Sequence, residues 1–210
     1  MPTLVIETAT AACSVALLRG TEVIASGHEV VGRGHAERLV PMIAALPDQG
    51  RAPRILVDVG PGSFTGVRVG LAAALGLAIG WGAEVHGYSS LALLAAAGSA
   101  ASPQSTALAA ILEGGHGEVF MQSFTASPLM PEGPLQSLIP AAALAALGGR
   151  VAIGSGVRHL VALDSALEPS DALPRAEDVR LLPPALASLP PRPIYGRAPD
   201  AKTLAERGLA

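Results

Sequence analysis

The chain has 210 residues, of which half are hydrophobic and 15% are charged, and its formal net charge is −3 at pH 7. This length suits one large domain or two small, closely packed lobes with a sizeable core. The acidic balance and the 3% of aromatic residues argue against a stand-alone nucleic-acid-binding protein, which needs a basic surface and rings for base stacking.

The sequence also indicates the cellular compartment in which the protein resides. Cys13 is the one cysteine, so no internal disulfide can form, which suits a reducing environment. The N-terminus lacks a basic segment followed by an apolar stretch, so secretion is not expected. The longest uncharged apolar run, 69–83, is shorter than the ~20 residues that a transmembrane helix needs. We therefore expect a cytoplasmic protein.

Apolar runs bounded by turn residues predict strands, and apolar residues at helical spacing predict helices. In the first half these patterns give strands at 3–7, 14–18 and 22–29, a helix at 36–46, a strand at 54–59, a helix at 65–81, a strand at 84–87 and a helix that Ser89 caps. The first three strands form an antiparallel meander. The remaining elements alternate between helix and strand.

The second half is predicted to be a weaker version of the first. It contains strands at 106–112 and 118–124 joined across glycines, a loop at 127–134, a helix at 140–147, a strand at 151–153 and an extended tail at 190–202. This order favours an α/β protein with mixed sheets in two related lobes, residues 1–99 and 100–210.

The most distinctive motif is a glycine loop, formed by Gly60, Pro61, Gly62, Ser63, Phe64, Thr65 and Gly66. A phosphate-binding Walker loop needs a lysine after the last glycine, and a dinucleotide-binding loop needs its third glycine one place earlier. The nucleophile elbow of serine hydrolases needs glycines where Pro61 and Thr65 stand. Two interpretations remain: anion binding at the start of the following helix, and close backbone packing, which we favour.

The helix at 65–81 is unusually rich in glycine and alanine. Each interior glycine costs a helix ~1 kcal/mol relative to alanine, so several together need a compensating close approach. Either tight packing inside the fold or docking of a partner subunit supplies this close approach. For docking, the expected contacts are Arg38, Leu39, Met42, Ile43, Val67, Leu71 and Ala74. A charge at Leu39 or Ala74 is then expected to abolish binding while the chain stays folded.

Metal chemistry finds little support in the pattern. The five histidines include no helical pair, and there is no cysteine pair, so we expect no catalytic or metal-binding residue. His35 stands alone at a helix start, where histidine is usually a capping or surface group.

Three segments carry a family resemblance: IETATAACSVAL at 6–17, HAERLVPM at 35–42 and GPGSFTGVRVG at 60–70. Weaker matches follow at 117–120, 153–156 and 193–195. Together they resemble the bacterial TsaB (YeaZ) family over nearly the whole chain. Three departures stand out: Glu7 replaces the usual aspartate, 114–116 is glycine-rich, and the link at 46–57 is short.

The resemblance implies an actin/Hsp70/sugar-kinase-like fold of two ribonuclease-H-like lobes, with mixed sheets flanked by helices. It implies a non-catalytic subunit that pairs with a TsaD-like catalytic subunit, together with a TsaE-like ATPase. The complex would transfer a threonylcarbamoyl group to the adenosine beside the anticodon in tRNAs that read codons beginning with A. ATP and metal would bind the partners, tRNA would bind through the complex, and the chain alone would form a homodimer.

Two features of the sequence agree with lost catalysis. Active members of this fold hold phosphates with a glycine-containing hairpin after the first strand, whereas this chain has Glu7-Thr8-Ala9-Thr10. TsaD-like proteins carry two metal-binding histidines on one helix, and here the matching positions hold His35 and Leu39. The alternative is an enzyme of the same superfamily, either a glycoprotease-like metallopeptidase or a nucleotide-binding enzyme.

Overall fold

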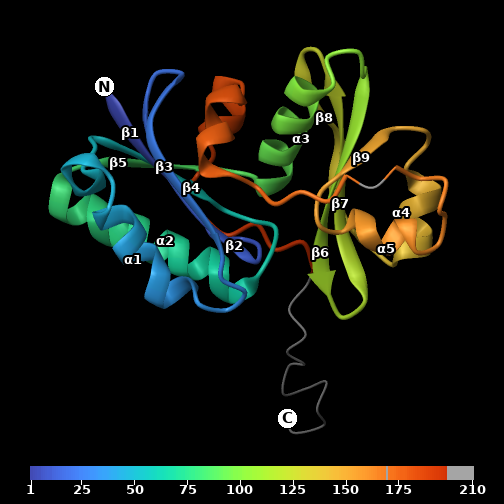
Figure 1. Cartoon of the computed structure of the whole chain (residues 1–210), viewed down its shortest axis with the longest axis horizontal. Helices are drawn as coiled ribbons and strands as arrows, with labels where there is room; N and C mark the ends of the chain where they lie inside the picture. Colours follow the sequence, from blue (N-terminus) through green and yellow to red (C-terminus); the bar gives the residue numbers. More distant parts are fainter. Residues whose placement is uncertain (169, 198–210) are drawn as a thin grey trace, which may run out of the picture.

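The computed structural model describes residues 1–168 and 170–197. Figure 1 shows two lobes side by side, each built on a mixed sheet with helices against it. Helices α1 and α2 cover one face of the first sheet. Helices α4 and α5 cover the far face of the second sheet, and α3 lies between the two sheets.

The first sheet contains the strands expected in the first half of the chain. They are β1 (Pro2–Glu7), β2 (Ala12–Arg19), β3 (Glu22–Val30), β4 (Arg54–Asp58) and β5 (Glu84–Tyr88), in the spatial order β3-β2-β1-β4-β5. The first three strands pair antiparallel, and β4 and β5 join parallel to β1. The crossovers are α1 (His35–Ala44), followed by a short turn at Pro47–Gly50, and α2 (Phe64–Trp81). This is the arrangement of a ribonuclease-H-like lobe.

The second sheet repeats the first in reduced form. It contains β6 (Ala107–Gly115), β7 (Glu118–Ala126), β8 (Leu129–Leu138) and β9 (Val151–Ile153), in the order β8-β7-β6-β9. The helices α4 (Pro140–Ala146) and α5 (Val157–Val161) occupy the places of α1 and α2. The shared strand order confirms the α/β fold of two related lobes.

Segments near the lobe boundary do not all pack on the lobe in which their residue numbers place them. Helix α3 (Ser90–Ala101) packs on β6, β7 and β8 of the second sheet. The short helices Ala176–Leu181 and Pro184–Ala187 return to β1, β2, β3 and β5 of the first sheet. The range 1–99 thus ends in a helix of the second lobe's core, and the range 100–210 includes residues that complete the first lobe. The tail expected at 190–202 is described only to residue 197.

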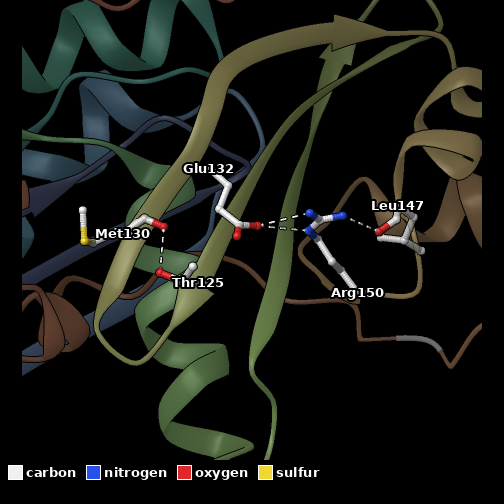
Figure 2. A network of polar contacts seen from close by, with 5 residues as sticks. All are labelled: Thr125, Met130, Glu132, Leu147 and Arg150. Atoms are coloured by element: carbon white, nitrogen blue, oxygen red, sulfur yellow. Dashed lines mark hydrogen bonds and ion pairs between the residues drawn. The ribbon is translucent and has the colours of Figure 1, made fainter.

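The loop expected at 127–134 is wrong, because most of it belongs to β8. Pro131 and Pro134 misled the prediction, but an edge strand tolerates proline where the missing N–H would face solvent. Figure 2 shows how this edge is held. The Arg150 guanidinium donates to the Glu132 carboxylate at 3.3 and 3.2 Å and to the Leu147 carbonyl at 3.3 Å. These bonds tie β8 to the segment between α4 and β9.

The glycines of α2 and its preceding loop fall into two groups. A Cβ on Gly62 or Gly66 would overlap the carbonyl oxygen of Ala9 or Thr8, well inside the 3.0 Å below which real Cβ contacts are essentially never seen. A Cβ on Gly76 or Gly80 would meet nothing within 4 Å. The first group is therefore required by packing against the end of β1, whereas no packing among the described residues explains the second.

This contrast predicts opposite effects for two alanine substitutions in the same helix. Gly66→Ala should destabilise the chain by ~3 kcal/mol, because the methyl group forces two backbone segments apart. Gly76→Ala should stabilise the isolated chain by ~0.5–1 kcal/mol, because it restores helix propensity without a clash. Urea unfolding of both variants measures this, and equal effects would contradict the packing described here.

Candidate functional site: the glycine loop and the outer faces of α1 and α2

The glycine loop is tied to the chain that follows β1. The Ser63 amide donates to the Ala9 carbonyl at 2.6 Å, and the Thr8 hydroxyl donates to the Gly66 carbonyl at 2.9 Å. The Ser63 hydroxyl caps α2 by accepting from the Gly66 amide at 3.2 Å. Close backbone packing, the interpretation favoured from the sequence, accounts for the loop's glycines.

Two buried carboxyl groups lie beneath this loop. Glu7 ends β1 and Asp58 ends the neighbouring parallel strand β4, and both side chains are fully buried. Asp58 Oδ2 accepts from the Thr8 amide at 2.8 Å and lies 3.1 Å from the Thr8 hydroxyl oxygen, whose single proton it shares with the Gly66 carbonyl. Glu7 accepts from the Ala9 amide at 3.0 Å and from the Ser90 hydroxyl at 3.1 Å. The pair therefore joins β1, β4 and the start of α3.

Burial changes the protonation of both groups. Desolvation raises the pKa of Asp58 from 3.8 to about 7, although the bonds from Thr8 and the nearby Gly60 amide oppose the shift. Desolvation raises the pKa of Glu7 well above its usual range, and the neighbouring Asp58 charge adds to the effect. Burial raises the pKa of both Tyr88 and Cys13, and the nearby charges of Glu7 and Asp58 add to each shift.

His35 is not a surface group. Its side chain is buried, and its Nε2 lies 3.2 Å from the Ala12 carbonyl oxygen, which ties the start of α1 to β2. Leu39, one turn further along, is buried in the core. Within the described residues, no three His, Cys, Asp or Glu side chains gather as metal ligands.

Most of the side chains predicted for the partner contact point inward. Six of the seven are buried in the core of the first lobe: Leu39, Met42, Ile43, Val67, Leu71 and Ala74. Only Arg38 is exposed, and it pairs with Glu29 on β3 at 2.5 Å. A charge at Leu39 or Ala74 would therefore unfold the chain, and neither variant reports on a partner.

The outward face of α2 is exposed and apolar, and α1 adds two exposed apolar residues to it. On α2 the outward residues Leu75 and Ile79 are 44% and 87% exposed, and the small residues Ala72, Gly76 and Gly80 lie beside them. On α1, Val40 is 58% exposed and Pro41 is also exposed. The two helices contact each other, and we call these outward residues together the α1/α2 face. By length and composition α2 could cross a membrane, yet it packs on β1, β4 and β5 of the sheet.

The carboxyl pair predicts a specific pH dependence of stability. A carboxyl group with a higher pKa in the folded state binds more protons when folded, so its contribution weakens as pH rises from about 4 to about 7. Asp58→Asn should flatten this decline by on the order of 2 kcal/mol in the free energy of unfolding. Denaturant unfolding at several pH values gives the slope of the free energy of unfolding against pH.

Glu29 provides a matched control, because the pH dependence of its contribution to stability has the opposite sign. Arg38 lowers the pKa of Glu29, so that exposed pair contributes stability above the usual carboxyl pKa and loses it as pH falls. Glu29→Gln should therefore lower stability at neutral pH relative to acid. If Asp58→Asn leaves the slope between pH 4 and 7 unchanged, the buried carboxyl does not titrate as described.

Two known proteins with similar sequences share one description. A protein of Escherichia coli (strain K12), described as tRNA threonylcarbamoyladenosine biosynthesis protein TsaB, is 38% identical over 132 residues, which cover 59% of this chain and 55% of that protein. A Bacillus subtilis (strain 168) protein with the same description is 38% identical over 103 residues, 47% of this chain and 45% of that protein. The chain thus spans about half the length of the curated relatives it matches.

A solved structure and a family model extend the likeness. YeaZ from Pseudomonas aeruginosa superposes with a TM-score of 0.76 and 27% sequence identity, covering 92% of this chain and 99% of that chain. Residues 22–127, half of the chain, match the family model described as TsaD: tRNA N6-adenosine threonylcarbamoyltransferase. The chain therefore belongs to this family, and within it to the TsaB (YeaZ) group.

Proposed function

We propose that this chain is a non-catalytic partner subunit in the threonylcarbamoylation of the adenosine beside the anticodon in tRNAs that read codons beginning with A. It would act in the cytoplasm with a TsaD-like catalytic subunit and a TsaE-like ATPase. ATP and metal would bind those partners, and tRNA would bind through the complex. The descriptions of its relatives, which name threonylcarbamoyladenosine biosynthesis, support this pathway.

The observation that carries the proposal is the α1/α2 face. Leu75 and Ile79 are large apolar residues that are exposed to solvent, and no contact in the part of the chain that the structure describes requires Gly76 and Gly80 to be small. Exposed apolar patches of this kind mark interaction sites, and small residues let two helix backbones approach closely. A partner's helices packed on this face would supply the gain that offsets the helix-weakening glycines. A second copy of the chain would use the same face when no partner is present.

The chain after β1 supports a non-catalytic role. In phosphate-binding members of this fold, amides of this hairpin hold the ligand. Here the Thr8 amide donates to Asp58 and the Ala9 amide donates to Glu7. The Ala9 carbonyl accepts from Ser63, which brings the glycine loop against the hairpin. These amides are satisfied by the chain's own carboxylates, so a phosphate would have to displace them.

Reconstitution tests the proposal. The chain and the TsaD-type protein from the same source are co-expressed, separated by size exclusion and assayed for threonylcarbamoyl transfer to tRNA. We expect a stable complex, transfer that depends on this chain, and no transfer by this chain alone. Transfer by this chain alone, or full transfer without it, would contradict the proposal.

A charge on the α1/α2 face should separate binding from folding. Ile79→Glu should weaken the complex by about 100-fold or more, because it buries an unpaired carboxylate in an apolar contact. The thermal unfolding of the isolated chain should not change, because Ile79 is 87% exposed. Calorimetry of the two purified subunits gives the affinity.

Ile139→Glu is the matched control, because Ile139 is also exposed, at 58%, but lies just before α4 in the second lobe. It should leave the affinity unchanged. Equal loss in both variants, or none in either, would show that the partner does not dock on the α1/α2 face.

A further inference from the structure

The chain crosses between the two lobes more than once. It enters the second lobe at α3 and returns to the first sheet with the short helix Ala176–Leu181. It then crosses again at residues 189–197, which we call the C-terminal strap. In Figure 1 the strap is the red segment that passes from the first lobe to the second. Residues 193–197 of the strap also line a cavity of about 950 Å³ between the lobes.

The strap begins as an addition to the first sheet. The Gly87 amide on β5 donates to the Leu189 carbonyl at 2.6 Å, and the Leu189 amide donates back to the Gly87 carbonyl at 3.0 Å. Further along, the Ile194 amide donates to the Val59 carbonyl, just after β4, at 2.7 Å. Backbone hydrogen bonds therefore hold the strap on the first lobe at both of these points.

Tyr195 ties the strap to the start of α2. Arg68 Nη2 donates to the Tyr195 hydroxyl at 3.1 Å, and the Phe64 and Tyr195 ring centroids are 6.0 Å apart with the rings tilted by 32°. The Arg68 guanidinium carbon lies 3.6 Å from the centroid of the Phe64 ring. Phe64 and Tyr195 remain 58% and 51% exposed, so these contacts hold the strap at the surface without burying it.

The next two residues of the strap contact the second lobe. Gly196 lies so close to the buried ring of Phe120 on β7 that a Cβ would overlap ring carbons. Arg197 Nη1 lies 3.4 Å from Glu118 Oε2, at the start of the same strand. The strap therefore joins α2 and the first sheet to β7 within a few residues.

A separate connection between the lobes is a shared hydrophobic core. One cluster of buried side chains includes Val5 and Leu56 of the first sheet, Leu108 and Phe124 of the second sheet, and most of α3. Among the described residues, none from α3 lines the cavity, whereas five residues of the strap do. The shared core and the strap therefore join the lobes at different places.

The two connections also differ in strength. Separating the shared core would expose many buried apolar side chains to water, which is costly. The strap reaches the second lobe through the contact of Gly196 with Phe120 and through the pair of Arg197 with Glu118, whose side chains are 28% and 30% exposed. Partly exposed ion pairs contribute little stability. The strap is thus the connection that is easier to release.

We infer that the C-terminal strap is a latch, which holds the two lobes together at the cavity while the shared core around α3 acts as the pivot. With the strap in place, the lobes form one rigid body and the cavity keeps a fixed width. Release of the strap from β7 lets the lobes rotate about α3, because no large apolar interface then restrains them at the cavity. The inference does not rest on the proposed function, since the strap contacts named here involve none of the outward residues of the α1/α2 face.

Spin labels on the full chain test the latch. Arg33→Cys and Leu163→Cys place one label on each lobe, after β3 and after α5, at positions that are exposed. Cys13 is fully buried, so it is protected from the label. Double electron–electron resonance gives the distribution of distances between the two labels. The labelled parent should give one narrow distribution, as a rigid body does.

Two substitutions should release the strap. Gly196→Ala places a methyl group against the Phe120 ring, which displaces the strap from the second lobe. Ile194→Pro removes the amide that donates to the Val59 carbonyl of the first lobe. Each should broaden the distance distribution about twofold and shift its mean to longer distances, because the lobes then rotate about the pivot.

Each substitution has a matched control. Ile194→Val keeps the amide donor, and Gly76→Ala adds a methyl group where nothing lies within 4 Å. Both should retain the distribution of the parent. Thermal unfolding checks that each variant is folded. If Ile194→Pro does not fold, Gly196→Ala decides, because it leaves every backbone donor in place.

A broad distribution in the parent would overturn the inference, because the lobes would then move with the strap in place. The parent's narrow distribution in folded Gly196→Ala would also overturn it, because the shared core alone would then hold the lobes. Docking on the α1/α2 face is measured separately, by the affinity of Ile79→Glu for the partner. Failure of the latch is therefore distinct from failure of the proposed function.

Discussion

The close approach of the β1–β2 hairpin to the start of α2 determines much of the first lobe. Gly62 and Gly66 bring the backbone of the loop and helix against the carbonyls of Ala9 and Thr8, where any side chain would collide. The same hairpin donates its amides to Glu7 and Asp58, two carboxyl groups buried at the ends of adjacent parallel strands. Burial of these groups favours their protonated forms, and the hydrogen bonds oppose that shift. The contact that fixes α2 therefore also occupies the amides that a catalytic relative would offer to a phosphate.

Because the hairpin contact holds α2 against the first sheet, the two faces of this helix have different roles. The inner face holds Val67, Leu71 and Ala74 in the core, while the outer face leaves Leu75 and Ile79 in water beside glycines that internal packing does not require. A helix held firmly on one side can present a preorganised surface on the other, which lowers the ordering cost of binding. The division supports a subunit that contributes a docking face while the chemistry takes place on its partner.

The sequence predicts the fold well because the apolar strands are short, continuous and bounded by glycine or polar turns. It fails at β8, where prolines that usually mark a loop lie in an edge strand that pairs with a neighbour on one side only. The sequence also predicts partner contacts for residues on the side of α2 that is buried in the core. That helix is apolar on both sides, so hydrophobic periodicity cannot show which side enters the core. Glu7 and Asp58 each end an apolar strand in the sequence, yet only the parallel pairing of β1 with β4 brings them together. The contacts of Tyr195 with Phe64 and Arg68 join the start of α2 to a residue more than half the chain away, so no local pattern indicates them.

The most direct test is amide hydrogen exchange of the full chain, measured by mass spectrometry with and without the TsaD-type protein from the same source. Added protection is expected in peptides from α1 and α2, whereas protection in peptides from β7, β8 and α4 should not change. Added protection confined to the second lobe, with α2 unchanged, would contradict the claim that the outer face of α2 is the partner-binding surface.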